Sequence, residues 1–315
     1  MPDRDALRSA LLAWYGPRSA AYPWRVGGGA YGVLVSEVML QQTQVSRVVP
    51  AWERFMARFP SPAVLAGAPL ADVLREWKGL GYNRRAAALW RAAAVLVAEY
   101  GGEVPGDLAA LRRLPGVGSY TAAAVAACSF GAPVVAMDTN VRRVVARNRL
   151  GVEPIDATPA QIAAAGEAWL DRSEPGAWNQ AVMDLGRELC RREPACPACP
   201  LRPGCRYPPA PARPGSRPRR LVRPQPRFAG SNRQLRGRIV DALREAESLT
   251  LGDLAGRWSE PLERVAAAVA GLAAEGLIQA GPAALEGRAA GRVRLGSGGA
   301  AAPKPITAAR GTVIP

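Results

Sequence analysis

Four of the five cysteines in this 315-residue chain lie in one short segment, CRREPACPACPLRPGC. They are Cys190, Cys196, Cys199 and Cys205, and the segment has one CxxC with wider gaps on both sides. Structural zinc sites usually have paired CxxC knuckles, so this pattern favours an iron-sulfur cluster held by four thiolates. Cys128 lies in an apolar helical stretch and is interpreted as a small core residue.

Two carboxylates have contrasting sequence surroundings. Glu37 lies in an otherwise apolar helical segment, where burial would keep its carboxyl group protonated near neutral pH. Asp138 precedes a helical segment that carries Arg142 and Arg143, a position where the helix N-terminus favours negative charge. One neutral and one ionised carboxyl group is the combination used in glycoside hydrolysis. The simpler alternatives are a partnered buried acid for Glu37 and a plain N-cap for Asp138.

Histidine is absent from the chain, and Lys78 and Lys304 are its only lysines. The absence of histidine excludes histidine acid–base catalysis, histidine metal ligands and Ser-His-Asp triads. A Schiff base could form only on these two lysines or on the terminal amine. Any catalysis must therefore depend on carboxylates, tyrosine, cysteine or a metal cluster.

Basic residues exceed acidic ones by 41 to 26, a formal net charge of +15. This excess favours an anionic partner, and nucleic acid is the first candidate. A GC-rich genome would explain the preference for arginine over lysine, but not the excess of basic over acidic residues. Neither a membrane span nor a signal peptide is expected, because no apolar run reaches 18 residues and the N-terminal segment carries charges. We therefore expect a cytoplasmic protein without a membrane partner.

Helical periodicity predicts an all-α domain over residues 1–207. The predicted helices span residues 44–59, 86–100, 119–128, 140–149 and 161–170, among others. Between two of these patterns, LPGVG forms a glycine-rich hairpin that holds Gly116 and Gly118. Backbone N–H groups in such a hairpin can point at a phosphate, with a helix N-terminus behind them.

The remaining chain is predicted to form three further segments. Residues 208–230 hold seven prolines and six arginines and read as an extended basic linker, either a solvated spacer or a phosphate-following segment. Residues 231–295 combine three helical patterns with two short strand-like pieces, which suggests a small winged-helix-like module. Residues 296–315 form a tail that is expected to be disordered.

Seven motifs occur together in one order and spacing: YPWR, SEVMLQQTQV, GLGYNRRA, LPGVGSYTA, MDTNVRRV, NQAVMDLG and the four-cysteine loop at 190–205. Over residues 12–207 this set resembles the adenine DNA glycosylases of the endonuclease III (helix-hairpin-helix) superfamily. The resemblance implies a helical fold of two subdomains with a [4Fe-4S] cluster. It also implies a monomeric enzyme of base excision repair that removes adenine mispaired with guanine or 8-oxoguanine in double-stranded DNA.

Three residues are implied to carry the reaction. Glu37 would protonate the departing adenine, and Asp138 would stabilise the positive charge that develops on the sugar. Tyr120 stands where bifunctional members of the superfamily have a lysine that attacks the sugar. A phenol cannot form that imine, so we expect a monofunctional glycosylase in which Tyr120 orients the acid or the base.

The resemblance assigns further residues to DNA and to the base. Extrusion of the target nucleotide is required because its glycosidic bond is inaccessible inside the stack. The implied base pocket is formed by Trp24, Arg25 and Gln180. The implied DNA contacts are Gln41, Gln42, Tyr82, Gly116, Gly118, Asn140 and Arg143, with Tyr82 as a wedge beside the opposite purine and Asn140 as a partner of Asp138.

Two departures from the family pattern stand out. Five residues separate Cys190 from Cys196, whereas the family has six. Residues 231–295 are also too short for the C-terminal domain, related to nucleotide-pyrophosphate hydrolases, that recognises 8-oxoguanine in longer members. Two alternatives stay open: a thymine or uracil mismatch glycosylase on the same scaffold, and a non-catalytic iron-sulfur DNA-binding regulator.

Overall fold

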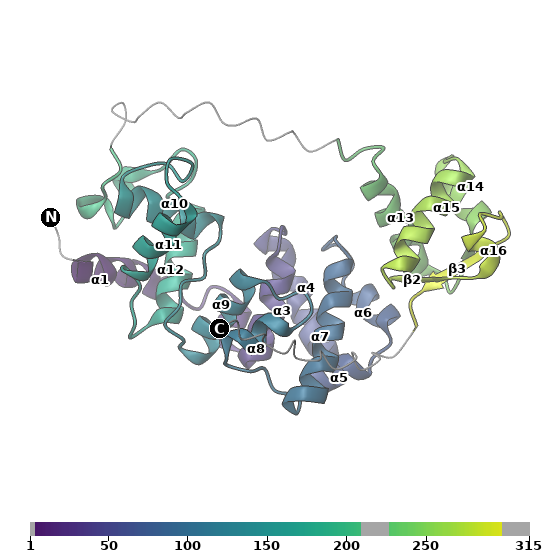
Figure 1. Ribbon diagram of the computed structural model, residues 1–315, viewed down its shortest axis with the longest axis horizontal. Coiled ribbons are helices and arrows are strands. Elements are labelled where there is room, and N and C mark those ends of the chain that lie inside the picture. The colour runs from purple at the N-terminus through teal and green to yellow at the C-terminus, as the bar shows by residue number, and fades with distance from the viewer. Residues whose placement is uncertain (1–3, 209–226, 298–315) are drawn as a thin grey trace, which may run out of the picture. The chain divides into compact units, whose positions relative to one another are not determined.

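A computed structural model of the chain describes residues 4–208 and 227–297 (Figure 1). The predicted basic linker at 208–230 and the predicted tail at 296–315 lie almost wholly outside these residues. The chain divides into two compact units, residues 1–53, 104–113 and 117–226 in one and residues 54–103, 114–116 and 227–315 in the other. None of the helices in the described ranges combines the length and apolar character that a bilayer-spanning segment requires.

The first unit is built from helices and short helical turns. Its elements are α1 (Arg4–Tyr15), η1 (Gly16–Arg18), α2 (Pro23–Val26), α3 (Gly29–Leu40), the first part of α4 (Val45–Arg58), α8 (Leu108–Arg113), α9 (Ser119–Phe130), α10 (Thr139–Val145), η2 (Ala146–Leu150), α11 (Pro159–Glu167), α12 (Pro175–Glu188), η3 (Cys196–Ala198) and η4 (Arg202–Gly204).

Small side chains allow the central helices of this unit to pack closely. Helix α9, SYTAAAVAACSF, buries every residue from Thr121 to Ala127. It lies beside α3, which is apolar on nearly all sides and is buried from Leu34 to Met39 (Figure 1). A helix that is hydrophobic all round belongs in a core. Glu37 is therefore carried on one of the most deeply buried helices of the unit.

The second unit contains the rest of α4 and two groups of elements. The first group is α5 (Pro62–Gly67), α6 (Leu70–Glu76) and α7 (Arg84–Tyr100). The second group is α13 (Asn232–Glu245), β1 (Leu249–Thr250), α14 (Leu251–Trp258), α15 (Leu262–Ala274), β2 (Ile278–Ala280), α16 (Pro282–Leu285) and β3 (Arg292–Leu295).

The three strands form one antiparallel sheet in the order β1-β3-β2. Strand β3 pairs Val293 with Leu249 on one side and Leu295 with Ile278 on the other. Its burial alternates along the strand, so that its arginines are exposed and its apolar residues are buried, and α13 lies against it. The two strand-like pieces predicted from the sequence correspond to β2 and β3. Strand β1 and α16 were not predicted, because two and four residues are too short to establish a period.

The all-α prediction is confirmed for residues 4–208, which contain no strand. Two predicted helix ends are wrong. The helix predicted over 140–149 is α-helical only to Val145 and continues as a π-helical turn over 146–150. The helix predicted over 161–170 ends at Glu167, because Trp169 and Leu170 turn into the core, where the Trp169 ring meets that of Trp178 edge-on at 5.3 Å.

Candidate active site

Glu37 is a carboxylic acid held almost out of contact with water. The residue is 4% exposed, and its Oε2 has no hydrogen-bond partner among the described residues. Burial raises the pKa of Glu37 to about 7, and the negative charge of Asp138 adds to this, while a hydrogen bond with Tyr120 and the charge of Arg25 act against it. The group can therefore hold a proton near neutral pH and give it up at that pH.

Tyr120 stands in the first turn of α9 and forms a side-chain hydrogen bond with Glu37. Burial raises the pKa of the Tyr120 phenol well above its usual value, and the negative charges of Glu37 and Asp138 raise it further. The phenol consequently stays protonated and acts as a donor. Its oxygen lies 3.5 Å from Sδ of Met183, so thioether and apolar atoms complete its surroundings.

Asp138 is the N-cap of α10, as the pattern MDTNVRRV predicts. Its Oδ1 accepts from the backbone N–H of Val141 at 2.6 Å, and its Oδ2 accepts from Nδ2 of Asn140 at 2.9 Å. Burial raises the pKa of Asp138, while these hydrogen bonds and the charge of Arg143 favour the carboxylate. Glu37 and Asp138 thus differ in their surroundings: Asp138 accepts hydrogen bonds from two N–H donors, and one oxygen of Glu37 accepts none.

Arg143 connects this carboxylate to the cysteine loop. Its Nη2 donates to Oδ1 of Asn140 at 2.8 Å and to the carbonyl of Gly186 at 2.7 Å, and its Nε donates to the carbonyl of Cys190 at 2.6 Å. The guanidinium is therefore committed to protein acceptors in this structure. Asn140 completes the chain of contacts as the hydrogen-bond partner of Asp138, as expected from the sequence.

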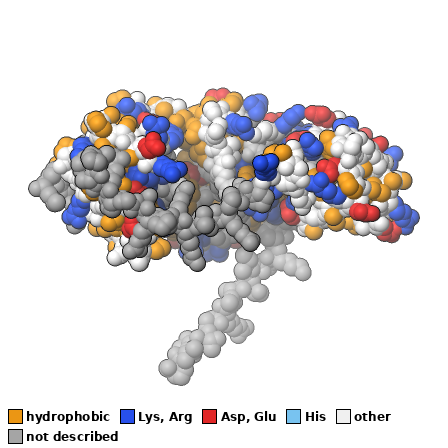
Figure 2. Space-filling view, turned by 90° about the horizontal axis from the view of Figure 1, so that it is seen from above, with side chains coloured by type: hydrophobic (Ala, Val, Ile, Leu, Met, Phe, Trp, Pro, Cys, Tyr) orange, Lys and Arg blue, Asp and Glu red, His pale blue; other side chains and the backbone are white. Residues whose placement is uncertain are grey.

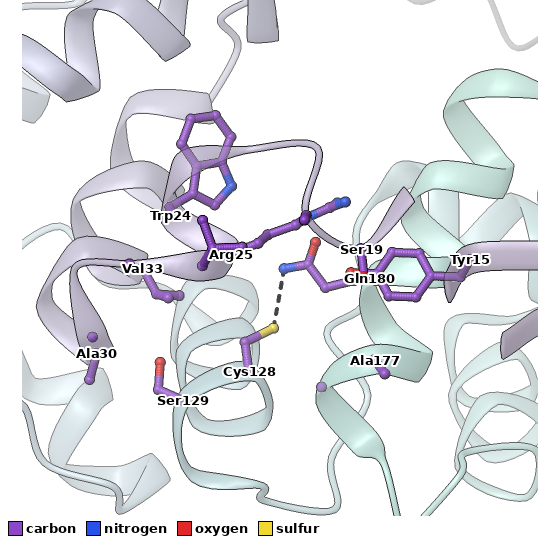
Figure 3. A pocket seen from close by; sticks show the side chains of 15 residues that line it. Tyr15, Ser19, Trp24, Arg25, Ala30, Val33, Cys128, Ser129, Ala177 and Gln180 are labelled. Carbon is purple, nitrogen blue, oxygen red and sulfur yellow. Dashed lines mark hydrogen bonds between the residues drawn. The ribbon is translucent and has the colours of Figure 1, made fainter. Parts of the chain in front are cut away.

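A cavity of about 520 Å³ in the first unit collects the residues predicted to form the base pocket. Trp24, Arg25 and Gln180 all line it, together with Val33 and Cys128 (Figure 3). Val33 stands one helical turn before Glu37, and the electrostatic influence of Glu37 reaches the Cys128 thiol, whose pKa burial raises to about 11. The amide Nε2 of Gln180 donates to Sγ of Cys128 at 3.4 Å (Figure 3).

Arg25 is fixed in this wall by a buried ion pair that was missed in the sequence. Its Nη atoms reach the two carboxylate oxygens of Asp184 at 2.9 and 3.1 Å, and the two side chains are only 7% and 4% exposed. The guanidinium also lies 4.8 Å from the Tyr22 ring centroid. Tyr22 in turn stacks on Trp24 at 5.1 Å. Asp184 lies in the motif NQAVMDLG, but its role as the ion-pair partner of Arg25 becomes apparent only in the structure.

The four cysteines of the loop are half-buried, and none of them is in a disulfide. Burial raises the pKa of Cys199 to about 11, and the charges of Cys190, Cys205 and Cys196 raise it further, so the four thiols influence one another. Within residues 4–208 and 227–297, however, no group of His, Cys, Asp or Glu side chains has the geometry to hold a metal ion.

A buried arginine supports one side of this loop. Arg147, 4% exposed, lies on the π-helical turn η2 and reaches Sγ of Cys190 at 3.7 Å and the carbonyl of Arg191 at 2.5 Å. It also pairs with Glu153 at 2.8 Å. A π-helical turn often marks a functional segment, and here it carries the arginine that contacts the cysteines.

The residues predicted to contact DNA lie in both units. In the first unit, Gln42 is exposed with φ of 57°, a left-handed conformation uncommon for a non-glycine residue, while Nε2 of Gln41 donates to Oγ1 of Thr121 at 3.3 Å. Gly118 is the exposed N-cap of α9. In the second unit, Tyr82 is 41% exposed with φ of 44°, and Gly116 is exposed with φ of 80°.

Comparison with known proteins identifies the family. Residues 35–171, which carry Glu37, Tyr120 and Asp138, match the HhH-GPD superfamily of base excision DNA repair proteins. An adenine DNA glycosylase of Mycolicibacterium smegmatis is 40% identical over 258 residues, which cover 81% of this chain and 86% of that protein. The chain belongs to the adenine DNA glycosylase family. The family is one of DNA repair enzymes, so the chain is a base excision DNA glycosylase, and the non-catalytic regulator is set aside.

Solved structures agree with this family at the level of the fold. A thermostable thymine-DNA glycosylase is 27% identical, with a TM-score of 0.60 over 65% of this chain and 95% of that one. Endonuclease III in a non-covalent complex with DNA is 28% identical, with a TM-score of 0.54 over 65% of this chain and 96% of that one. This chain therefore shares its helical fold with the thymine-DNA glycosylase and with endonuclease III.

Proposed function

We propose that this enzyme releases adenine from A:G and A:8-oxoguanine mispairs in duplex DNA by hydrolysing the N-glycosidic bond. The observation that carries the proposal is the placement of Glu37: a buried acid with a pKa near 7, hydrogen-bonded to Tyr120 and close to the charge of Asp138. Similarity to adenine DNA glycosylases supports adenine as the base.

The reaction follows from the different surroundings of the two acids. Glu37 gives its proton to a ring nitrogen of adenine, the C1′–N9 bond breaks, and the bonding electron pair leaves with the base. Positive charge develops at C1′, where the carboxylate of Asp138 stabilises it. Water then adds to C1′ and loses a proton, which leaves an abasic site. General acid catalysis of this kind contributes roughly 10²- to 10⁴-fold.

The cavity that Val33 and Cys128 line, one helical turn from Glu37 along α3, is the proposed site of the extruded adenine. Trp24 supplies an aromatic wall, and Arg25 and Gln180 supply polar groups at its edge. Gln41 and Gln42 are proposed to enter the duplex beside the vacated position. The exposed backbone at Gly116 and Gly118 is proposed to hold phosphate through N–H groups. Arg143 is proposed to act on DNA indirectly, by holding Asn140 and Asp138.

Tyr120 makes the enzyme monofunctional in this proposal. Its phenol stays protonated beside Glu37 and cannot form an imine with the sugar. Tyr120→Lys would place an amine at that position. We expect this variant to form a borohydride-trappable adduct with an abasic duplex and to nick it without alkali. Wild type that forms the adduct would contradict the monofunctional assignment.

The four cysteines are proposed to hold a [4Fe-4S] cluster. The chemical type of the donors supports this proposal, because four cysteine sulfurs from one loop, with Arg147 against Cys190, are the ligands that such clusters use. When bound, the cluster would fix the loop at 190–205 and take no part in the proton transfer. Iron and acid-labile sulfide should be found at about four per chain. Zinc in place of iron, or no metal in freshly purified protein, would contradict this assignment.

The C-terminal module is proposed to be of winged-helix type and to act in a monomer. Its element order and the sheet order β1-β3-β2 support this topology. Helix α15, which would be the recognition helix, exposes Glu263, Ala267 and Ala270, and its Arg264 pairs with Glu260. Such a surface offers no hydrogen-bond donors to base edges. The module is therefore unsuited to reading a sequence.

A duplex panel tests the proposed activity. Single-turnover base release would be measured on A:8-oxoguanine, A:G, T:G and U:G duplexes, with and without later alkali. We expect release from the two adenine mispairs and strand breaks only after alkali. Release of pyrimidine alone would favour a thymine or uracil mismatch glycosylase, the second candidate, which the likeness to a thymine-DNA glycosylase supports.

A further inference from the structure

A single buried guanidinium in the second unit connects the C-terminal module to helices α6 and α7. The side chain of Arg244, in the last turn of α13, is 5% exposed. Its Nε donates to the carbonyl of Leu74 at 2.8 Å, and its Nη2 donates to Oδ1 of Asn83 at 2.8 Å. Its Nη1 pairs with Asp241 on its own helix. An arginine this deeply buried requires that its donors be satisfied, and all three of its nitrogens are.

Both acceptors outside α13 are groups that helix ends leave unpaired. Leu74 lies in the last turn of α6, where backbone carbonyls lack an intrahelical partner and carry partial negative charge. Asn83 is the N-cap of α7, but its side chain makes no capping hydrogen bond. Its oxygen accepts from Arg244 instead. The side chain of Asn83 therefore accepts a hydrogen bond from a residue more than 160 positions away, in place of the usual capping hydrogen bond to α7.

Asn83 directly follows Tyr82, the exposed aromatic residue of the loop between α6 and α7. Tyr82 is 41% exposed and adopts a left-handed conformation, which a bulky residue keeps only when its surroundings enforce it. On one side, Arg85 donates to the carbonyls of Leu80 and Gly81, with its guanidinium 5.6 Å from the Tyr82 ring. On the other side, Arg244 holds Asn83. The loop is thus fixed by one arginine of its own helix and one of the C-terminal module.

Other contacts show that this tie belongs to a continuous interface within the unit. Nζ of Lys78 lies 3.0 Å from a carboxylate oxygen of Glu245, an exposed pair. A side chain at Gly296, just after β3, would meet the Leu70 side chain of α6 at 3.2 Å. The module is therefore packed on the segment that carries Tyr82.

We propose that Arg244 is a positioning residue for DNA recognition: through Asn83 it fixes Tyr82 as a rigid aromatic platform that stacks on a base of the mispaired duplex. This inference rests on the proposed function and extends it by giving the C-terminal module a part in mispair recognition. An exposed, preorganised aromatic side chain beside cationic groups is suited to base stacking. Because the module reaches the duplex through Tyr82, its alanine-faced α15 need not read bases.

A double-mutant cycle tests this coupling. Dissociation constants would be measured for an A:8-oxoguanine duplex and for a fully paired duplex, with wild type, Arg244→Met, Tyr82→Ala and the double variant. We expect each single variant to weaken mispair binding about 10-fold, as the loss of one stacked base would. The double variant should be no weaker than the weaker single one, and paired-duplex binding should stay within about two-fold.

The matched control is Glu245→Gln, which removes an exposed ion pair from the same interface and should leave both dissociation constants within about two-fold. If Arg244→Met fails to unfold cooperatively, Asn83→Ala replaces it in the cycle, since it removes one acceptor and leaves Arg244 bonded to Leu74 and Asp241. It should reproduce the 10-fold loss.

Two outcomes would overturn the inference while the proposed function stands: multiplicative losses in the double variant of an enzyme that releases adenine, or an equal loss on mispaired and paired duplexes. Arg244→Met and Asn83→Ala that both bind as wild type would overturn it as well. A wild-type chain that releases no adenine would instead overturn the proposed function, and this inference with it.

Discussion

Asn140 holds the carboxylate of Asp138 through a hydrogen bond of 2.9 Å from its Nδ2 to Oδ2. This donor lowers the pKa of Asp138 against the opposing effect of burial. The same amide accepts from Arg143 on its other side, so it cannot rotate without breaking two contacts. Asn140 therefore favours the ionised form of the Asp138 carboxyl group.

Asn140→Ala should raise the pKa of Asp138 and slow base release. Asp138 must be ionised to stabilise positive charge, so the acid limb of the pH–rate profile should move to higher pH. A hydrogen bond to a charged group is worth about 1.5–3 kcal/mol, which corresponds to roughly a 10- to 100-fold lower rate at neutral pH. Single-turnover rates between pH 4 and 8 would measure both changes. A uniform decrease with an unmoved acid limb would show that Asn140 acts in some other way.

Glu37→Gln should abolish measurable base release, because the amide has no proton to transfer. In the wild type the rate should fall as pH rises above about 7, since the donor form of Glu37 is lost there. The decline should approach ten-fold per pH unit. Single-turnover rates at saturating enzyme provide the measurement. A variant that retains wild-type rates, or a wild type with a flat alkaline limb, would remove Glu37 from the role of general acid.

Glu37 should also make the stability of the fold depend on pH. Its pKa is about 7 in the folded state and 4.5 in the reference state, so the folded chain binds the proton more tightly. The resulting stabilisation is complete below pH 4.5 and is lost as pH rises through 7. It amounts to about 3 kcal/mol at its limit. Urea unfolding from pH 4 to 8 should show wild type losing free energy of unfolding relative to Glu37→Gln. Parallel curves would contradict this.

Asp184→Ala should destabilise the first unit strongly. The substitution leaves the Arg25 guanidinium buried without its carboxylate, which costs about 3–5 kcal/mol in comparable buried pairs. The control is Glu188→Gln, whose partners Arg187 and Arg18 are exposed and whose loss should cost less than about 1 kcal/mol. Urea unfolding at neutral pH compares the two. Similar losses for both variants would show that the Arg25–Asp184 pair is not a structural anchor.

Local patterns predicted several of the helices, the burial of Glu37 and the N-cap position of Asp138, because each of these depends on near neighbours. Apolar spacing marked α4, α7 and α9, and MDTNVRRV placed Asp138 at the start of α10. Glu37 could be assigned to a buried helix because the residues around it are apolar. These signals need no information from distant parts of the chain.

The parts that escaped prediction depend on partners far away in the chain. Asp184 becomes informative only beside Arg25, 159 positions earlier, and Arg244 only beside Asn83, 161 positions earlier. The π-helical turn at 146–150 departs from the regular helical period and carries Arg147, which contacts Cys190 of the distant cysteine loop. Strand β1 has two residues and owes its existence to pairing with β3. Periodicity cannot report such features.

Basic residues illustrate the same limit on a larger scale. The charge excess predicts an anionic partner, and on the face shown in Figure 2 the blue side chains of lysine and arginine are scattered among other side chains. Several arginines instead donate hydrogen bonds within the protein, namely Arg25, Arg143, Arg147 and Arg244. The net charge includes these arginines as well as those that could bind phosphate, so it does not show how many are available for DNA.

The glycine hairpin places a constraint on a residue outside every motif. A Cβ at Gly116 would lie 2.7 Å from the Cβ of Ala88 on α7, so the turn and the helix meet with no room to spare. Alanine at position 88 could be dismissed as the habit of a GC-rich genome, yet its methyl group already fills the space in which a side chain at residue 116 would lie. The turn proposed to bind phosphate therefore depends on two small residues that lie close together in space, Gly116 in the hairpin and Ala88 on α7.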